Sequence, residues 1–325
     1  MKTSDIEKDL LRRISGQNLV SEEKIFSGQE TERKPAEKPK KKGNGLADIA
    51  GMNELKDFIK EGFINVLKNR KCAEAYGIKP PSMLFYGPAG CGKTFFAEKI
   101  AEELGINFIK IVPDDLACTW IHGTQQKIGE VFRNAEKEAP TLLFFDEFDA
   151  MVPKRSGGEE NQHYNGEVNE FLCMLNNASE RGVYVLAATN HPEYIDKAVL
   201  RTGRIDEMVY VDMPDMEARK SLFALSLSKL PFEEDIDMTR LAELTEGYNC
   251  SDICYIVQSA ARKMFNATIK EKAEDYRLIS QTLLEEVISK KNPSVSKKEL
   301  REYERIRGEF SPKDEGCRPA VIGFR

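Results

Sequence analysis

Three glycines, a lysine and a threonine are spaced so that they could bind a polyphosphate. In the stretch MLFYGPAGCGKT, Gly87, Gly90 and Gly92 lead to Lys93 and Thr94, which matches the pattern G-x-x-x-x-G-K-[ST]. Because glycine lacks a Cβ atom, such a loop can wrap closely around phosphate oxygens and turn its N–H groups inward. A strand before the loop and a helix after it would place these donors at a helix N-terminus, which favours anions. Lys93 would reach the β- and γ-phosphates of a nucleotide, and the Thr94 hydroxyl would hold Mg²⁺.

A second stretch supplies carboxylates. Residues 141–149, TLLFFDEFD, form an apolar run that ends in acids, as expected of a buried parallel strand whose carboxyl end faces a site. Asp146 would hold Mg²⁺ through its water shell, and Glu147 would polarise an attacking water. On a strand the two adjacent side chains would point to opposite faces, which allows distinct roles. The alternative is a strand that simply leaves the sheet through an acidic turn.

Apolar periodicity predicts the elements that position these residues. Five apolar runs alternate with helical patterns, which predicts an α/β fold: a doubly wound parallel-sheet P-loop NTPase domain with its site at the carboxyl ends of the strands. Beyond residue 214 the patterns are helical only, which predicts a small all-α lid domain. The apolar runs are residues 83–86, 107–112, 141–149, 183–188 and 209–211, and helical patterns include residues 55–66, 95–104 and 125–138.

The same patterns divide the chain into four expected segments. Residues 4–14 predict an amphipathic helix that could dock a partner or pack on its own chain, and a polar stretch with three successive lysines follows as a linker or localisation signal. The expected segments are an N-terminal helix and flexible linker at 1–45, a large nucleotide-binding domain at 46–213, a helical lid at 214–275, and C-terminal helices with a tail at 276–325.

Composition restricts the class of protein. No apolar run approaches the ~20 residues of a membrane span and no signal peptide opens the chain, so we expect a cytoplasmic protein. The 7 cysteines are scattered without a C-x-x-C pair, which predicts neither disulfides nor a zinc site. Residues 1–45 carry 11 Lys and Arg against 8 Asp and Glu, whereas the remainder carries 37 against 46. The acidic body argues against nucleic acid as a partner, because nonspecific binding relies on neutralising phosphates.

With these motifs assembled, residues 46–310 resemble the AAA clade of AAA+ ATPases, the group that includes the valosin-containing protein, the proteasomal ATPases and the FtsH-type enzymes. GPAGCGKT is similar to the Walker A loop, and LLFFDE to the Walker B strand. Asn190, which ends VYVLAATN, falls on the first sensor position, where the family positions the attacking water. Arg201 and Arg204 in AVLRTGRIDE fall on paired arginines that project into the neighbouring subunit's site. The alternative for these arginines is a pair of surface salt bridges near Asp206.

The resemblance also implies a nucleotide-binding set and a pore loop. LADIAGMNELK is similar to the segment that closes over adenine, GYNCSDI to the lid motif, and PSVSKKELREYERI to a C-terminal helix of remodelling members. Asn249 and Cys250 depart from the commonest form of the lid motif. Trp120 and Ile121 stand at the substrate pore loop, with His122 where the family usually has glycine. The implied ATP contacts are Ile49, Ala50, Gly51, Gly87, Pro88, Ala89, Gly90, Cys91, Gly92, Lys93, Thr94, Phe95, Gly247 and Ser251.

The function that this resemblance implies is an ATP- and Mg²⁺-dependent ring, expected to be a homohexamer, that threads polypeptide through a central pore to remodel or unfold it. One alternative is a nucleic-acid motor or loader, because the AAA+ architecture serves both. Another is a scaffold that assembles on ATP binding. H-E-x-x-H is absent from the sequence, so proteolysis would need a separate protease partner, and an adaptor is a further expected partner.

Overall fold

The structure, a computed structural model, describes residues 43–117, 123–154, 162–271 and 276–310. The pore-loop residues Trp120 and Ile121 lie outside these ranges, as do the N-terminal helix and nearly all of the linker that the sequence predicts.

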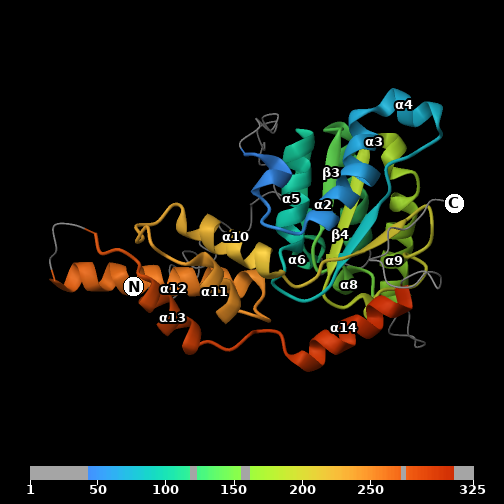
Figure 1. The fold of residues 1–325 in the computed structure, drawn as a ribbon. Coiled ribbons are helices and arrows are strands. Elements are labelled where there is room, and N and C mark those ends of the chain that lie inside the picture. Colours follow the sequence, from blue (N-terminus) through green and yellow to red (C-terminus); the bar gives the residue numbers. More distant parts are fainter. Residues whose placement is uncertain (1–42, 118–122, 155–161, 272–275, 311–325) are drawn as a thin grey trace, which may run out of the picture. The chain divides into compact units, whose positions relative to one another are not determined.

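The predicted parallel sheet is confirmed. Its strands are β1 (Met83–Tyr86), β2 (Asn107–Ile111), β3 (Thr141–Phe145), β4 (Val183–Thr189) and β5 (Glu207–Tyr210). All pair in parallel in the order β2-β3-β4-β1-β5 (Figure 1). β1 therefore lies between two strands that follow it late in the chain. The loop after β1 opens at this reversal of strand order, where ligands of such sheets bind.

Strands β1, β3 and β4 are buried along their whole length because both faces of the sheet are covered. Side chains alternate between two cores along β3: Leu142 and Phe144 face one core, and Leu143 and Phe145 face the other. The first core is covered by α2 (Asn53–Ile59), η3 (Lys60–Ile64) and α5 (Lys93–Leu104). The second is covered by α7 (Gly123–Lys137) and α9 (Gln162–Leu175).

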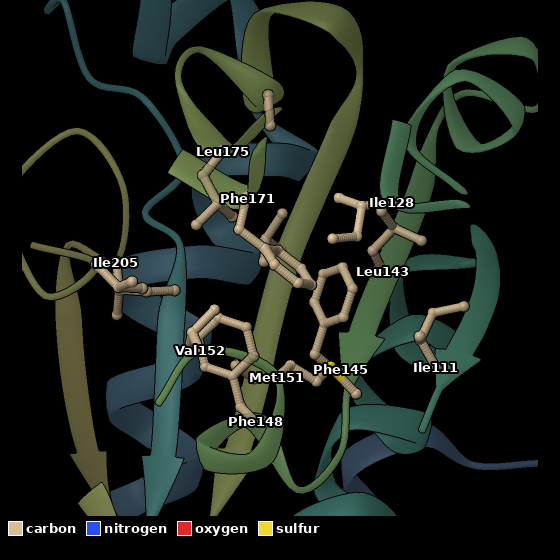
Figure 2. Close-up of a cluster of buried hydrophobic side chains, with 14 of the residues drawn as sticks. Ile111, Ile128, Leu143, Phe145, Phe148, Met151, Val152, Phe171, Leu175 and Ile205 are labelled. Atoms are coloured by element: carbon tan, nitrogen blue, oxygen red, sulfur yellow. The ribbon is translucent and has the colours of Figure 1, made fainter. Parts of the chain in front are cut away.

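The second core is rich in aromatic rings. Phe145 stacks near Phe132 with ring centroids 5.9 Å apart, and it meets Phe171 edge to face at 5.3 Å. Phe148, which follows the carboxylates, packs on the same rings at 5.8 Å (Figure 2). This cluster anchors the segments on both sides of Asp146 and Glu147, so it fixes the carboxyl end of β3 at the candidate site.

The helix expected at residues 55–66 is interrupted. It runs as α2, then the π-helical segment η3, then α3 (Asn65–Lys68). Phe63 and Ile64 are buried in the π-helical part, and this packing compensates for a rare helical geometry. The short elements are η2 (Gly45–Asp48), α4 (Arg70–Ala75), α6 (Pro113–Leu116), α8 (Phe148–Met151), η5 (Ala178–Arg181) and η6 (Pro192–Tyr194).

The helical part after residue 214 has a core of its own. It consists of α10 (Met216–Leu227), α11 (Met238–Leu244), α12 (Cys250–Glu271) and α13 (Gln281–Ser289). The carboxylates of Asp215 and Asp237 and the hydroxyl of Ser280 cap three of these helices by accepting backbone N–H bonds. Leu284 of α13 shares this core with residues of the three preceding helices. We therefore propose that the lid extends beyond the expected boundary at residue 275 and includes α13.

The last described helix, α14 (Lys297–Phe310), returns to the sheet (Figure 1). Phe310 meets Tyr86 at the end of β1, with ring centroids 6.0 Å apart. The Arg307 guanidinium lies 5.1 Å from the ring centroid of Tyr210 at the end of β5. Helix α14 thus contacts the carboxyl ends of two neighbouring strands, β1 and β5. The loop that begins at Gly87 follows the first of them.

Candidate active site

The loop after β1 has the tight backbone that the motif predicts. Gly87 has φ +139°, and a Cβ atom there would lie 2.4 Å from the Val211 carbonyl oxygen. Gly90 has φ +76°, and its Cβ would lie 2.6 Å from the Asn249 amide nitrogen. Both positions require glycine on conformational and steric grounds. At Gly92, by contrast, an added Cβ would meet nothing within 4 Å, so this part of the loop can be approached closely by a ligand.

Lys93 is buried inside this loop. Its ammonium donates hydrogen bonds to the Gly87 and Pro88 carbonyl oxygens, at 2.9 and 2.8 Å. Burial lowers the pKa of Lys93 to about 8, because a buried ammonium loses its hydration. A loop of inward-turning glycines around a buried cation fits the polyphosphate that the motif predicts.

Two neighbours of Lys93 differ in exposure. Cys91 is buried, with its sulfur 3.6 Å from the Met213 sulfur, and burial raises the pKa of its thiol to about 12. The thiol is therefore neutral and packs as an apolar group. Phe95 is 41% exposed, although it lies in a helix whose next residue is fully buried. Its ring is available to a ligand rather than to the core.

Thr94 and Asp146 come together at the end of β3. The Thr94 hydroxyl donates to the Asp146 Oδ2 at 3.0 Å, and Lys110 of β2 places its ammonium 2.8 Å from the same oxygen. A hydroxyl and a carboxylate are hard oxygen ligands of the kind that Mg²⁺ uses, usually with retained waters. The donor set therefore fits the predicted metal. Lys110 was not anticipated from the sequence.

The expectation that Asp146 and Glu147 lie on a strand is wrong. β3 ends at Phe145, and Glu147 adopts a left-handed conformation with φ +53° immediately before α8. The chain turns here because Phe148 must enter the aromatic core. Strand alternation therefore does not set the directions of these two side chains. The Glu147 side chain is exposed, and such a positive φ is uncommon in residues other than glycine.

The end of β4 is held by a small polar network. The Thr189 hydroxyl donates to the Asp149 carboxylate at 2.5 Å and accepts from the His191 backbone N–H at 2.8 Å. Asn190 lies between these residues, and its carbonyl oxygen accepts a bond of 2.9 Å from the Tyr303 hydroxyl of α14. The Asn190 side-chain amide takes part in none of these bonds.

Arg201 and Arg204 are in different settings. Arg201 is exposed, whereas one Arg204 guanidinium nitrogen donates to the Ala198 carbonyl oxygen at 2.7 Å. Within the part of the chain that the structure describes, neither arginine forms an ion pair. The Asp206 carboxylate instead accepts backbone N–H bonds from Ser82 and Gly203. The described residues therefore do not show surface salt bridges near Asp206, which was the alternative for these arginines. Arg201 is the more exposed of the two.

The helical part contacts the phosphate-binding loop directly. The Asn249 amide donates to the Ala89 carbonyl oxygen at 2.9 Å, and the Ser251 N–H donates to the Gly90 carbonyl oxygen at 3.1 Å. Asn249, one of the two departures from the family pattern, thus links the lid motif to the loop. Gly247, just before it, has φ +79°.

The segment expected to lie over adenine also packs against the helical part. Ile49 is buried, and Gly51 has φ +60° with no room for a side chain, since a Cβ would lie 2.4 Å from the Ala218 Cβ of α10. Ala50 lies between them and is half-buried. The Asp48 carboxylate forms an ion pair with the Lys99 ammonium of α5, with 2.7 Å between Oδ2 and Nζ. The turn is thereby held against both the loop helix and the lid.

Two residues near the site could not be located by motif spacing. They are Lys110 and Tyr303, and each contacts a site residue distant in sequence. The only sequence signal for Tyr303 was its place in the expected C-terminal helix. Lys110 stands as a single charge in an otherwise apolar run, which is the signal that could have marked it.

Comparison with known proteins agrees with this geometry. The family model of AAA, "ATPase family associated with various cellular activities", matches residues 83–213, which contain the loop, the carboxylates and both arginines. The fold and the family match therefore define residues 83–213 as an ATP-binding ATPase domain of the AAA family.

Three curated relatives have similar sequences. The "Cell division cycle protein 48 homolog" of Archaeoglobus fulgidus is 33% identical over 273 residues, which cover 81% of this chain and 37% of that protein. The "Putative cell division cycle ATPase" of Plasmodium falciparum is 34% identical over 224 residues, 68% of this chain and 18% of that protein. The "Putative ribosome biogenesis ATPase nvl" of Dictyostelium discoideum is 30% identical over 270 residues, which cover 81% of this chain and 31% of that protein. The chain thus spans less than two fifths of each relative's length. None of the helices in the described ranges is long and apolar enough to cross a membrane.

Proposed function

We propose that copies of this chain form a ring, expected to be a homohexamer, that hydrolyses ATP to remodel or unfold polypeptides. The observation that carries the proposal is the contact between the start of α5, which holds Lys93 and Thr94, and Asp146 just after β3. Glu147 is the next residue in the chain. Relatives named as a cell division cycle protein and a cell division cycle ATPase support the ATP-dependent part.

The chain's own residues would perform distinct steps at the γ-phosphate. Lys93 and the loop N–H groups bind the β- and γ-phosphates, and the Asn190 amide orients a water in line with the bond to be broken. The Glu147 carboxylate polarises that water as it attacks phosphorus, and ADP leaves with the bridging oxygen. Mg²⁺, held by Thr94 and Asp146, would supply charge screening for the phosphates.

The lid would sense the nucleotide through the loop itself. Ile49, Ala50 and Gly51 supply backbone contacts to adenine in this proposal, and Gly247 and Ser251 lie on the lid side of the site. The hydrogen bonds from Asn249 and Ser251 to the loop carbonyls mean that a shift of the loop on phosphate binding is passed to α12. Rotation of the helical part would then convert hydrolysis into motion.

Arg201 and Arg204 would complete the site of a neighbouring copy. Phosphoryl transfer relies on electrostatic stabilisation, and an arginine supplied in trans contributes roughly 10³ to 10⁵ in rate. The exposure of Arg201 supports this role, because a cation without an ion-pair partner among the described residues is available to another chain. Activity would therefore require assembly.

The remaining parts of the proposal concern partners. Trp120 and Ile121 would grip the polypeptide in a central pore, and an adaptor or a separate protease could act with the ring. The cytoplasmic location remains a prediction of the sequence.

The experiment is ATP turnover at concentrations that favour assembly, measured with no addition, with an unfolded polypeptide and with single-stranded DNA. Stimulation by polypeptide that is lost in Trp120→Ala, with basal turnover retained, supports the remodelling motor. Salt-sensitive stimulation by DNA alone would instead make the chain a nucleic-acid motor. ATP-dependent assembly without turnover would make it a scaffold.

A further inference from the structure

Lys110 is a cation held at the candidate metal site by the sheet. β2 and β3 pair in register with Lys110 opposite Phe144, two residues before Asp146. The Asp146 backbone N–H then donates to the Ile111 carbonyl oxygen at 2.9 Å. The Cα of Lys110 is therefore fixed relative to the carboxylate, and only its flexible side chain can move.

The ammonium of Lys110 contacts the atom on which the metal site is built. The Asp146 Oδ2 accepts from the Thr94 hydroxyl at 3.0 Å and lies 2.8 Å from the Lys110 Nζ. Lys93, by contrast, gives its ammonium to the Gly87 and Pro88 carbonyl oxygens. Lys110 is thus the cation that neutralises Asp146 directly.

We propose that Lys110 is a positioning residue that shares the Asp146 carboxylate with Mg²⁺, so that one or the other neutralises it when nucleotide is bound. Without a cation there, Asp146 would repel the phosphates of an incoming nucleotide. An ammonium and a metal ion on one carboxylate would repel each other, so metal binding releases Lys110. The Lys110 side chain is 39% exposed, against 22% for Asp146, so it can turn into solvent or toward a phosphate oxygen.

The consequence is a reduced dependence of ATP binding on Mg²⁺. Lys110 supports the binding of metal-free ATP and contributes little once the metal is present. This inference rests on the metal role that the proposed function gives to Asp146. The competing explanation is a surface ion pair without functional effect, because exposed pairs commonly contribute little.

The test compares dissociation constants for ATP, measured by calorimetry on the full chain with excess Mg²⁺ and with EDTA. Lys110→Met removes the charge while keeping an unbranched side chain, and Lys110→Arg keeps the charge. Lys79→Met is the matched control, because Lys79 is also ion-paired, to Glu180 at 2.7 Å, and these two residues precede β1 and β4 whereas the site lies at the carboxyl ends of the strands. Far-UV circular dichroism verifies that each variant is folded.

In Lys110→Met, ATP binding in EDTA should weaken about five- to tenfold, which is the effect of one partly screened charge, while binding with Mg²⁺ changes less than about twofold. Lys110→Arg and Lys79→Met should match the wild type in both conditions. Equal weakening in both conditions, or no weakening in either, overturns the inference.

The wild type separates this inference from the proposed function. If Mg²⁺ tightens its ATP binding and Asp146→Asn removes that effect, the metal role of Asp146 holds and only the Lys110 variants decide the inference. Were Mg²⁺ to have no effect on the wild type, the metal role and the inference would both fail.

Discussion

Replacing Asp252 with asparagine should destabilise the helical part of the protein. The Asp252 side chain is 3% exposed and accepts three hydrogen bonds from the connection between α13 and α14. The donors are the Ser294 N–H at 2.9 Å, the Ser294 hydroxyl at 2.5 Å and the Lys291 ammonium at 2.7 Å. Asp252 lies in the first turn of α12 and inside the lid motif, so its bonds to Ser294 and Lys291 connect this motif to the segment that leads into α14.

The magnitude follows from these contacts. Breaking a buried charged pair costs about 3–5 kcal/mol, and a hydrogen bond to a charged group is worth about 1.5–3 kcal/mol. Asparagine keeps one acceptor oxygen, and Lys291 is 19% exposed and can regain water. We therefore expect Asp252→Asn to lower the free energy of unfolding by about 2–4 kcal/mol.

The pH dependence has a definite sign. Burial alone would raise the pKa of Asp252, but the hydrogen bonds from Lys291 and Ser294 hold it below its ordinary value. A carboxyl whose pKa is lowered by folding contributes stability above its unfolded pKa, and this contribution is lost as the pH falls through the folded pKa. The difference between wild type and Asp252→Asn should therefore be largest near neutral pH and should narrow as the pH falls below about 4.

Urea unfolding followed by far-UV circular dichroism measures both effects. Glu286→Gln is the control, because Glu286 also contacts two lysines but lies in solvent on α13, so its loss should not be detected. A change of less than about 0.5 kcal/mol in Asp252→Asn, which is the range of ordinary surface substitutions, would refute the reasoning. So would a difference that stays constant as the pH is lowered.

Three further predictions follow from single contacts. Tyr303→Phe removes the bond to the Asn190 carbonyl and should lower turnover several-fold while ATP affinity stays within about twofold, and an equal loss of affinity would contradict a positioning role. Asn249→Ala removes the amide bond to Ala89 and should weaken ATP binding about threefold to tenfold by calorimetry, whereas unchanged affinity would show that this bond does not couple the lid to ATP binding. Phe145→Ala should lower the free energy of unfolding by about 3–5 kcal/mol, against little change for the exposed Phe265→Ala, and equal effects would argue against the aromatic core.

Features determined locally could be predicted from the sequence. The strand of the P-loop is an unbroken apolar run because both faces are buried, and the glycines at 87 and 90 follow from backbone conformations that only glycine adopts without strain. Sheet class, strand positions and the loop lysine all follow from such short-range rules. β5 begins at Glu207, two residues before the start at residue 209 that the apolar run predicts, because its bounds depend on pairing with β1.

Features determined by long-range packing could not be predicted. The turn at Glu147 exists because Phe148 is drawn into an aromatic core built from distant segments, and a strand pattern gives no sign of it. The contact of Asn249 with the loop joins residues 160 positions apart. Lys110 meets Asp146 only because β2 and β3 are neighbours in the sheet. The residues of these two segments do not by themselves predict that order.

The central claim is that ATP is hydrolysed at a site that two copies of the chain complete together. Its most direct test is ATP turnover by a mixture of two variants. Glu147→Gln should bind ATP without hydrolysing it, and Arg201→Ala should lack the cation supplied to a neighbour. Each should be nearly inactive alone.

Mixed before assembly, the two variants should regain activity. Each Arg201→Ala copy keeps an intact Glu147 and can receive Arg201 from a Glu147→Gln neighbour, and random mixing of equal amounts makes about a quarter of the interfaces complete. Turnover that rises toward that fraction of the wild-type rate is the predicted result. A mixture no more active than its two components, with assembly confirmed by light scattering, would contradict a site shared between copies.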